Sequence, residues 1–224
     1  MTKKERKIVL PGGKCNFCGN RYSVQGMSAH LKKCVEKDKQ DQALLQNKII
    51  KLSSIFHIVV RGECFYWLQI EADGKTTLYE LDSFLRDIWV ECCMHLSMFR
   101  INDINYSYSP MKEYDERSMN VALHKALKPG TRFDYEYDFG STTHLILKVL
   151  GVRTGKIDKK GIRLLARNDA PEILCSYCDN LATDICAECS EWTCKNCRKK
   201  HECDEEMLLP VVNSPRAGVC GYCG

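Results

Sequence analysis

The middle of the chain, residues 53–168, carries the apolar pattern of a folded domain. β-Branched and aromatic residues fill residues 56–61 and 64–70, which predicts two strands followed by a turn. Thr77 is suited to cap a helix that runs through Cys92. Apolar residues recur along this helix at three- and four-residue steps and form its expected buried face: Leu78, Leu81, Phe84, Leu85, Ile88 and Trp89.

The second half of this segment adds more strands. Its predicted elements are two strands within residues 95–108, a short helix at 119–127, an antiparallel pair at 131–137 and 145–152, and a last strand at 161–166. Strands and helices do not alternate in a regular strand–helix–strand rhythm. The predicted class is therefore α+β, with a central mixed or antiparallel sheet and helices on one face.

A stretch without Gly or Pro, residues 37–52, precedes this domain and predicts a linker helix. Leu45, Ile49 and Leu52 form one apolar stripe, which we expect to pack on the neighbouring domain rather than to dimerise. The predicted organisation has four parts: a finger at residues 1–36, the linker helix at 37–52, the central domain at 53–168 and a cysteine-rich module at 171–224.

Composition and charge add to this picture. The chain has 224 residues, 15 of them cysteine. No apolar run reaches the roughly 20 residues that span a bilayer, and the run after the basic N-terminus is too short for a signal peptide. A reducing cytoplasm is therefore the expected location, where cysteines serve as metal ligands rather than disulfides.

Charge is distributed unevenly along the chain. Residues 1–51 hold 12 Lys/Arg against 4 Asp/Glu, residues 52–170 hold 16 of each, and residues 171–224 hold 5 against 9. The net charges are thus +8, 0 and −4. A basic end attracts phosphate and an acidic end does not, so the two ends are expected to have different partners.

The basic end contains a C2HC finger pattern. Cys15 and Cys18 are separated by two residues, and His30 and Cys34 are four apart, so each pair can reach one ion. The pattern predicts a zinc site. Residues near the start of the finger helix face nucleic acid in base-reading fingers, so the candidate contacts are Arg21, Gln25, Lys32 and Lys33. The alternative is a finger that only packs on the next domain.

No catalytic motif is present: the chain has no phosphate-binding glycine loop, no H-E-x-x-H and no G-x-S-x-G. Three carboxylates alternate at strand spacing and therefore share one face of a strand: Asp134, Glu136 and Asp138. Such a set can bind a hard cation, but it is more often the solvent-facing side of an edge strand. Three other cysteines lie among apolar residues, and we expect buried free thiols: Cys64, Cys92 and Cys93. His57 and His144 are expected to be ordinary sheet residues.

The last fifty residues hold nine cysteines, eight of them in C-x-x-C pairs. Two intervening residues let both thiolates of a pair reach one tetrahedral ion. The pairs are Cys175/Cys178, Cys186/Cys189, Cys194/Cys197 and Cys220/Cys223, with His201 and Cys203 between the last two. Because so few apolar residues accompany them, the module must take its stability from metal.

The central domain resembles a known family. Residues 130–143, GTRFDYEYDFGSTT, resemble the hallmark of the plasmid Ri (pRiA-type) ORF-three-like family, also labelled insertion-element passenger, TnpR-like. Residues 76–81, TTLYEL, match its first helix, and residues 209–222 resemble members with a cysteine-rich tail. Residues 141–144 here replace the acidic residue and tryptophan that follow the motif in many members. The resemblance implies an association with mobile elements.

The spacing of the C-terminal module is similar to that of B-box and HIT-type fingers. In those fingers the first and third pairs share one zinc ion and the second and fourth share another. The resemblance implies one site from Cys175, Cys178, Cys194 and Cys197, and a second from Cys186, Cys189, His201 and Cys203. Cys220 and Cys223 then remain as a half-site that replaces a member of the second site, recruits a partner's ligands or stays free. This gives about three zinc ions in all.

Three functions fit these observations. The first is a non-enzymatic zinc protein that associates with DNA or RNA through its basic finger and with protein through its acidic module, whose acids include Asp184, Glu188, Glu191 and residues 204–206. The second is a protein–protein adaptor, for which Trp192 is either an exposed anchor or part of the zinc core. The third is an enzyme with an unrecognised site in the central domain.

Overall fold

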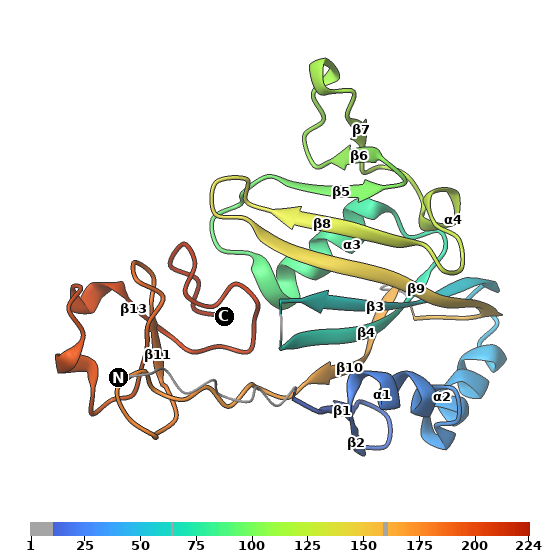
Figure 1. Ribbon diagram of the computed structural model, residues 1–224. Helices are drawn as coiled ribbons and strands as arrows, with labels where there is room; N and C mark the ends of the chain where they lie inside the picture. Colours follow the sequence, from blue (N-terminus) through green and yellow to red (C-terminus); the bar gives the residue numbers. More distant parts are fainter. Residues whose placement is uncertain (1–10, 64, 159–160) are drawn as a thin grey trace.

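A computed structural model describes residues 11–63, 65–158 and 161–224 (Figure 1). Within these residues one sheet contains ten strands, in the order β2-β1-β10-β4-β3-β9-β8-β5-β6-β7. Neighbouring strands are antiparallel except for the parallel pair β6 and β7. The strands are β1 (Gly13–Cys15), β2 (Arg21–Tyr22), β3 (Ser53–Gly62), β4 (Tyr66–Asp73), β5 (Ser97–Ile101), β6 (Ile104–Ser107), β7 (Arg117–Ser118), β8 (Arg132–Tyr137), β9 (Thr143–Gly155) and β10 (Ile162–Asn168).

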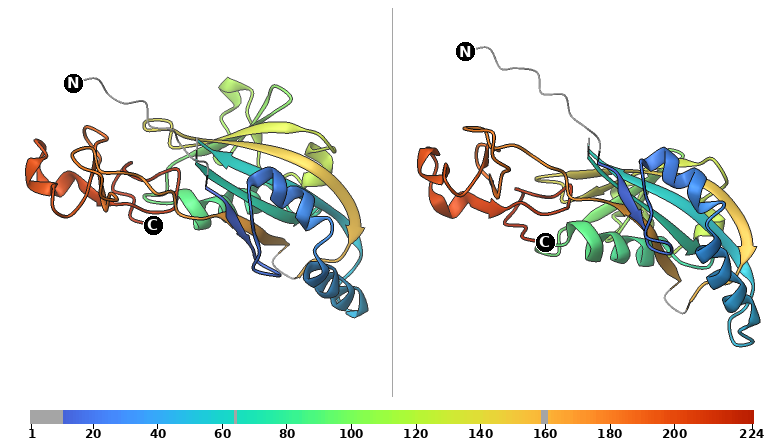
Figure 2. Two further views of the ribbon diagram at one scale, coloured as in Figure 1. Left: turned by 60° about the horizontal axis from the view of Figure 1, so that its bottom comes forward. Right: turned by 90° about the horizontal axis from the view of Figure 1, so that it is seen from below.

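The sheet confirms the α+β class, although helices lie on both of its faces rather than on one face as predicted. Ile58 and Val60 of β3 point into the main core, under helix α3 (Leu78–Leu85). Val59 lies between them in sequence and therefore points to the opposite face, where it packs with Trp67 under helix α1 (Val24–Leu31). Figure 2 shows these two helices on opposite sides of the sheet.

The predicted central helix is present and begins where expected. The Thr77 side chain accepts a hydrogen bond from the Glu80 N–H, and the Glu80 carboxylate accepts one from the Thr77 N–H, which makes a capping box. The helix continues as a π-helical turn, η1 (Arg86–Val90), that buries Trp89 completely. The predicted helix at 119–127 shortens to α4 (Leu123–Ala126).

The N-terminal segment is built into the sheet. Strand β1 pairs with β10, and Met27 and Leu31 of α1 are buried against Trp67. Gly13 is required at the junction, because a β-carbon there would lie 2.5 Å from the Trp67 ring. The finger therefore shares a core with the central strands.

Helix α2 (Val35–Gln46) follows α1, but the expected packing of its apolar stripe is wrong. Leu45, Ile49 and Leu52 are 38%, 82% and 57% exposed, because the helix ends at Gln46 and breaks the stripe. Ion pairs attach α2 to the sheet instead. Lys37 pairs with Asp41 of the same helix and with the buried Glu71 of β4.

The C-terminal residues form a separate small sheet and then return to the large one. Strand β11 (Asp184–Cys186) lies between β12 (Trp192–Thr193) and β13 (Leu208–Pro210). After β13 the chain runs back to the central sheet, where Arg216 is fully buried (Figure 1). No helix in the described part of the chain is long and apolar enough to cross a membrane.

Candidate metal centres

Four groups of cysteine and histidine side chains stand out among the described residues. In each group the four ligand atoms all lie within 4.8 Å of one another. A tetrahedral zinc ion with Zn–S bonds of about 2.3 Å places its sulfurs about 3.8 Å apart, so groups this compact are compatible with zinc. The groups therefore can hold metal ions.

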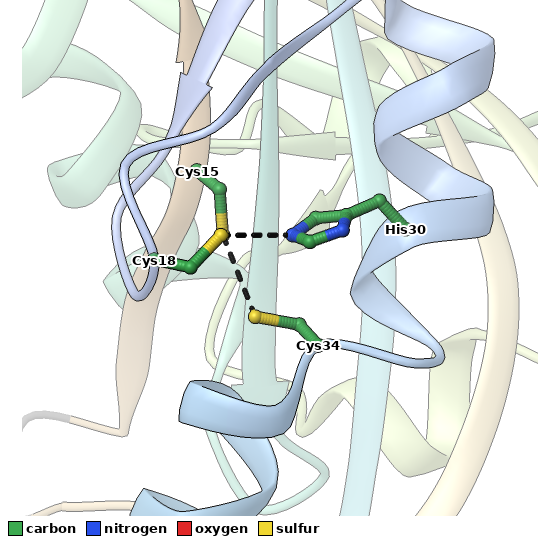
Figure 3. Close-up of side chains that lie close together, drawn as sticks. All are labelled: Cys15, Cys18, His30 and Cys34. Atoms are coloured by element: carbon green, nitrogen blue, oxygen red, sulfur yellow. Dashed lines mark hydrogen bonds between the residues drawn. The ribbon is translucent and has the colours of Figure 1, made fainter.

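The first group is the predicted finger site (Figure 3). Cys15 closes β1, Cys18 lies in the following turn, His30 projects from α1 and Cys34 is the N-cap of α2. The sulfurs of Cys15 and Cys34 are 3.9 Å apart, and Cys18 Sγ is 3.2 Å from His30 Nε2. The His30 ring stacks on Tyr22, which fixes its orientation.

The second group joins the first and third C-terminal pairs, as the resemblance to cross-braced fingers implied. Cys178 Sγ lies 3.6 Å from the sulfurs of Cys194 and Cys197. Cys175, the fourth member, is fully buried, and its N–H donates to the Asn180 carbonyl, which closes the loop that carries Cys178.

The third group joins Cys186, Cys189, His201 and Cys203. Cys189 Sγ is 3.2 Å from His201 Nε2, which makes Nε2 the ligand atom. Burial raises the pKa of Cys186, but N–H donors from Cys189 and Glu188 outweigh it and lower the pKa to about 7, toward the thiolate that binds metal.

The fourth group was missed by the sequence prediction. It contains Cys92, Cys93 and His95, from the loop between η1 and β5, together with Cys220 from the end of the chain. The expectation of buried free thiols is wrong here, because Cys93 is exposed and Cys92 half-buried. The spacing C-C-x-H was a usable signal, but its fourth ligand is distant in sequence. Cys64 lies outside the described residues.

Cys220 and Cys223 do not act together as a pair. Cys220 joins the loop of Cys92, whereas the Cys223 thiol is exposed and faces the Gly221 carbonyl. Cys220 has a left-handed backbone (φ 51°), and its Sγ lies 3.3 Å from His95 Nε2 of the central domain. The two cysteines of the predicted half-site, Cys220 and Cys223, therefore lie in different surroundings.

The three carboxylates of the predicted strand face do not gather into a site. Asp134 and Glu136 are half-exposed on β8, and Asp134 lies 3.3 Å from His144. Asp138 lies beyond the strand end, with a left-handed backbone (φ 65°), and pairs with the buried Arg216. Two hollows near the N-terminal segment include neither Asp138 nor His144.

His57 lies in β3 as an ordinary sheet residue. Burial lowers the pKa of His57, against the opposing effect of its hydrogen bond with Gln69. The ring nitrogen Nε2 lies 2.9 Å from Gln69 Oε1. The amide of Gln69 in turn donates to Ser28 of the finger helix, so this polar chain helps to position α1.

The proposed nucleic-acid contacts are all exposed. Gln25 lies on the outer face of α1, opposite the buried Met27, and Lys32 and Lys33 follow the helix. Arg21 pairs with Asp169, which partly neutralises it.

The acidic surface of the C-terminal module is smaller than the sequence suggested. Asp184 is buried and paired with Arg198, and Glu191 is half-buried and accepts the Tyr177 hydroxyl. Glu188 and residues 204–206 are exposed. Trp192 is half-buried in strand β12.

Comparisons with known proteins add little. No protein-family model and no curated protein matches the chain. Among solved structures, a protein of unknown function (MM3350) from Methanosarcina mazei Go1 is similar over 52% of this chain and 68% of its own. The sequence identity is 11% and the TM-score 0.41.

Proposed function

We propose that this is a metal-stabilised, non-enzymatic protein that binds nucleic acid through its N-terminal finger. The observation that carries this proposal is the exposed outer face of α1. Gln25 lies there, and the exposed Lys32 and Lys33 follow in the turn after the helix, in the segment of net charge +8, while the inner face is buried on the sheet. Cations held on a rigid element suit phosphate binding.

The position of α1 favours phosphate contact over base reading. A base-reading finger inserts the start of its helix into the major groove. Here Val24, at the helix start, is buried, and Ser28 accepts a hydrogen bond from Gln69 of β4. We therefore propose sequence-independent binding of DNA or RNA. The resemblance of residues 130–143 to a family associated with mobile elements supports DNA as the ligand.

The test is a titration of duplex DNA, single strands and structured RNA at several salt concentrations. Neutralising two phosphate contacts in Lys32→Gln/Lys33→Gln should weaken binding and reduce the slope of log affinity against log salt by about 2 for duplex DNA. Lys199→Gln/Lys200→Gln is the matched control, because these lysines are also exposed but belong to the acidic module. Binding without a salt slope, or equal losses in both variants, would contradict the proposal.

A protein–protein adaptor is the second candidate. The exposed run Glu205-Glu206-Met207, next to the third metal group, offers acidic side chains beside a methionine that is 41% exposed. Such a surface suits a basic protein partner. Absence of any salt-dependent nucleic-acid binding, with partners that persist after nuclease treatment, would favour this function.

A further inference from the structure

We propose that Cys92, Cys93, His95 and Cys220 form a fourth zinc site, which clamps the C-terminal segment to the central sheet. His95 Nε2 lies 3.3 Å from Cys220 Sγ, and Cys93 Sγ lies 4.0 Å from it. Three thiols and one imidazole are the ligands of structural zinc. This site is independent of the proposed nucleic-acid function.

The loop that carries three of the ligands is held in shape by its own hydrogen bonds. The Tyr137 hydroxyl accepts from the backbone N–H groups of Cys92 (3.4 Å) and His95 (3.3 Å) and donates to Glu91 (2.9 Å). The same Glu91 carboxylate accepts the Met94 N–H at 2.6 Å. The three ligands are thus positioned by β8 and η1 rather than by the tail.

The histidine has the surroundings of a metal ligand. While its Nε2 faces Cys220, its Nδ1 lies 3.6 Å from a carboxylate oxygen of Asp138, at ion-pair distance. Metal-ligating histidines commonly direct the second nitrogen at a carboxylate, which fixes the ring and strengthens the ligand. The Asp138 carboxylate therefore lies beside the second nitrogen of His95.

The tail is docked so that Cys220 reaches this loop. Arg216 is fully buried and donates to Asp138 (2.7 Å) and Thr143 (3.0 Å), and the Ser214 hydroxyl donates to the Trp89 carbonyl (2.5 Å). Asp138 contacts both the tail and the ligand histidine. An ion bound to Cys220 would close a loop of more than 120 residues, and its binding energy would then stabilise the docked tail.

The experiment compares variants of the full, reduced chain by native mass spectrometry and hydrogen exchange. Cys220→Ser/Cys223→Ser should bind one ion fewer than wild type and should exchange faster in residues 213–222. The double variant is used because Cys223 lies on the same turn and is a potential substitute ligand. Cys223→Ser is the matched control and should keep every ion, because this thiol lies outside the group.

A second variant, Cys93→Ser, alters the loop instead of the tail and should also lose one ion. Two ligands of this site, Cys93 and Cys220, are exposed. A chelator should therefore remove the ion of this site before the ions of the other three groups. Unchanged metal content in both Cys93→Ser and the double variant would overturn the proposal. So would a Cys93–Cys220 disulfide that mass analysis finds to persist in the folded protein kept under reducing conditions.

Discussion

Glu71 shows at the scale of a single residue how the finger is joined to the sheet. It is 3% exposed in β4 and contacts Lys37 of α2, Arg153 of β9 and Arg163 of β10. Burial raises the pKa of Glu71, but the hydrogen bonds from Arg153 and the charges of Arg163 and Lys37 outweigh it. They lower the pKa from the ordinary 4.5 to about 2.

Replacing Glu71 should therefore be costly. In Glu71→Gln, the side chains of Lys37, Arg153 and Arg163 keep only their ion pairs with Asp41. Breaking a buried ion network of this kind costs about 3 kcal/mol of unfolding free energy. The measurement is urea unfolding at pH 7 with zinc present. Glu36→Gln is the control: its exposed pair with Lys39 is worth less than about 1 kcal/mol. Equal losses in the two variants would contradict the account.

The pH dependence has a definite sign. A carboxylate whose pKa is lowered by folding stabilises the protein above its unfolded pKa, near 4.5, and loses that contribution as the pH falls to about 2. The stability difference between wild type and Glu71→Gln should shrink over this window. Acid loss of metal affects both proteins, so the difference between them isolates Glu71. A constant difference would contradict the assignment.

Local ligand patterns were predictable at this scale, and long-range ones were not. The spacing of Cys15, Cys18, His30 and Cys34 indicated their grouping, since a turn and a helix face bring them together. Cys93 is brought to Cys220 only by the docked tail, which Arg216 holds. The local sequence pattern does not indicate such a contact, so Cys93 was predicted to be a buried free thiol and Cys220 to form a half-site with Cys223.

At the scale of elements, most strands follow from composition. The antiparallel pair β8 and β9 was predicted, and Asn102 and Asp103, both left-handed, form the turn between β5 and β6. The pairing of β1 with β10 was not foreseen, because it joins residues about 150 positions apart. Helix α2 was extended too far, since helix propensity alone does not show where tertiary contacts end.

The cross-braced module makes a sharp prediction about pairs of substitutions. Cys175 and Cys194 lie in one group and Cys186 in another. Native mass spectrometry should therefore find one ion lost in Cys175→Ser/Cys194→Ser but two in Cys175→Ser/Cys186→Ser. Sites strung in sequence order would give the reverse, two and then one. Cys223→Ser serves again as a control that loses none.

At the scale of the whole molecule, the N-terminal finger and the C-terminal segment are both attached to the central sheet. The N-terminal finger adds strands at one edge, and the C-terminal segment returns to the turn at Asp138 (Figure 1). Each attachment lies beside a cysteine–histidine group. Metal ions would thus stabilise the contacts between parts of the chain as well as the parts themselves.

The most direct test of this account is the number of metal ions bound to the intact, reduced and folded chain. The sequence alone indicated about three, and the four groups brought together in the fold predict four zinc ions per chain. Native mass spectrometry with elemental analysis supplies that number. Four ions would support the account, and a stably folded chain that saturates at three or fewer would contradict it.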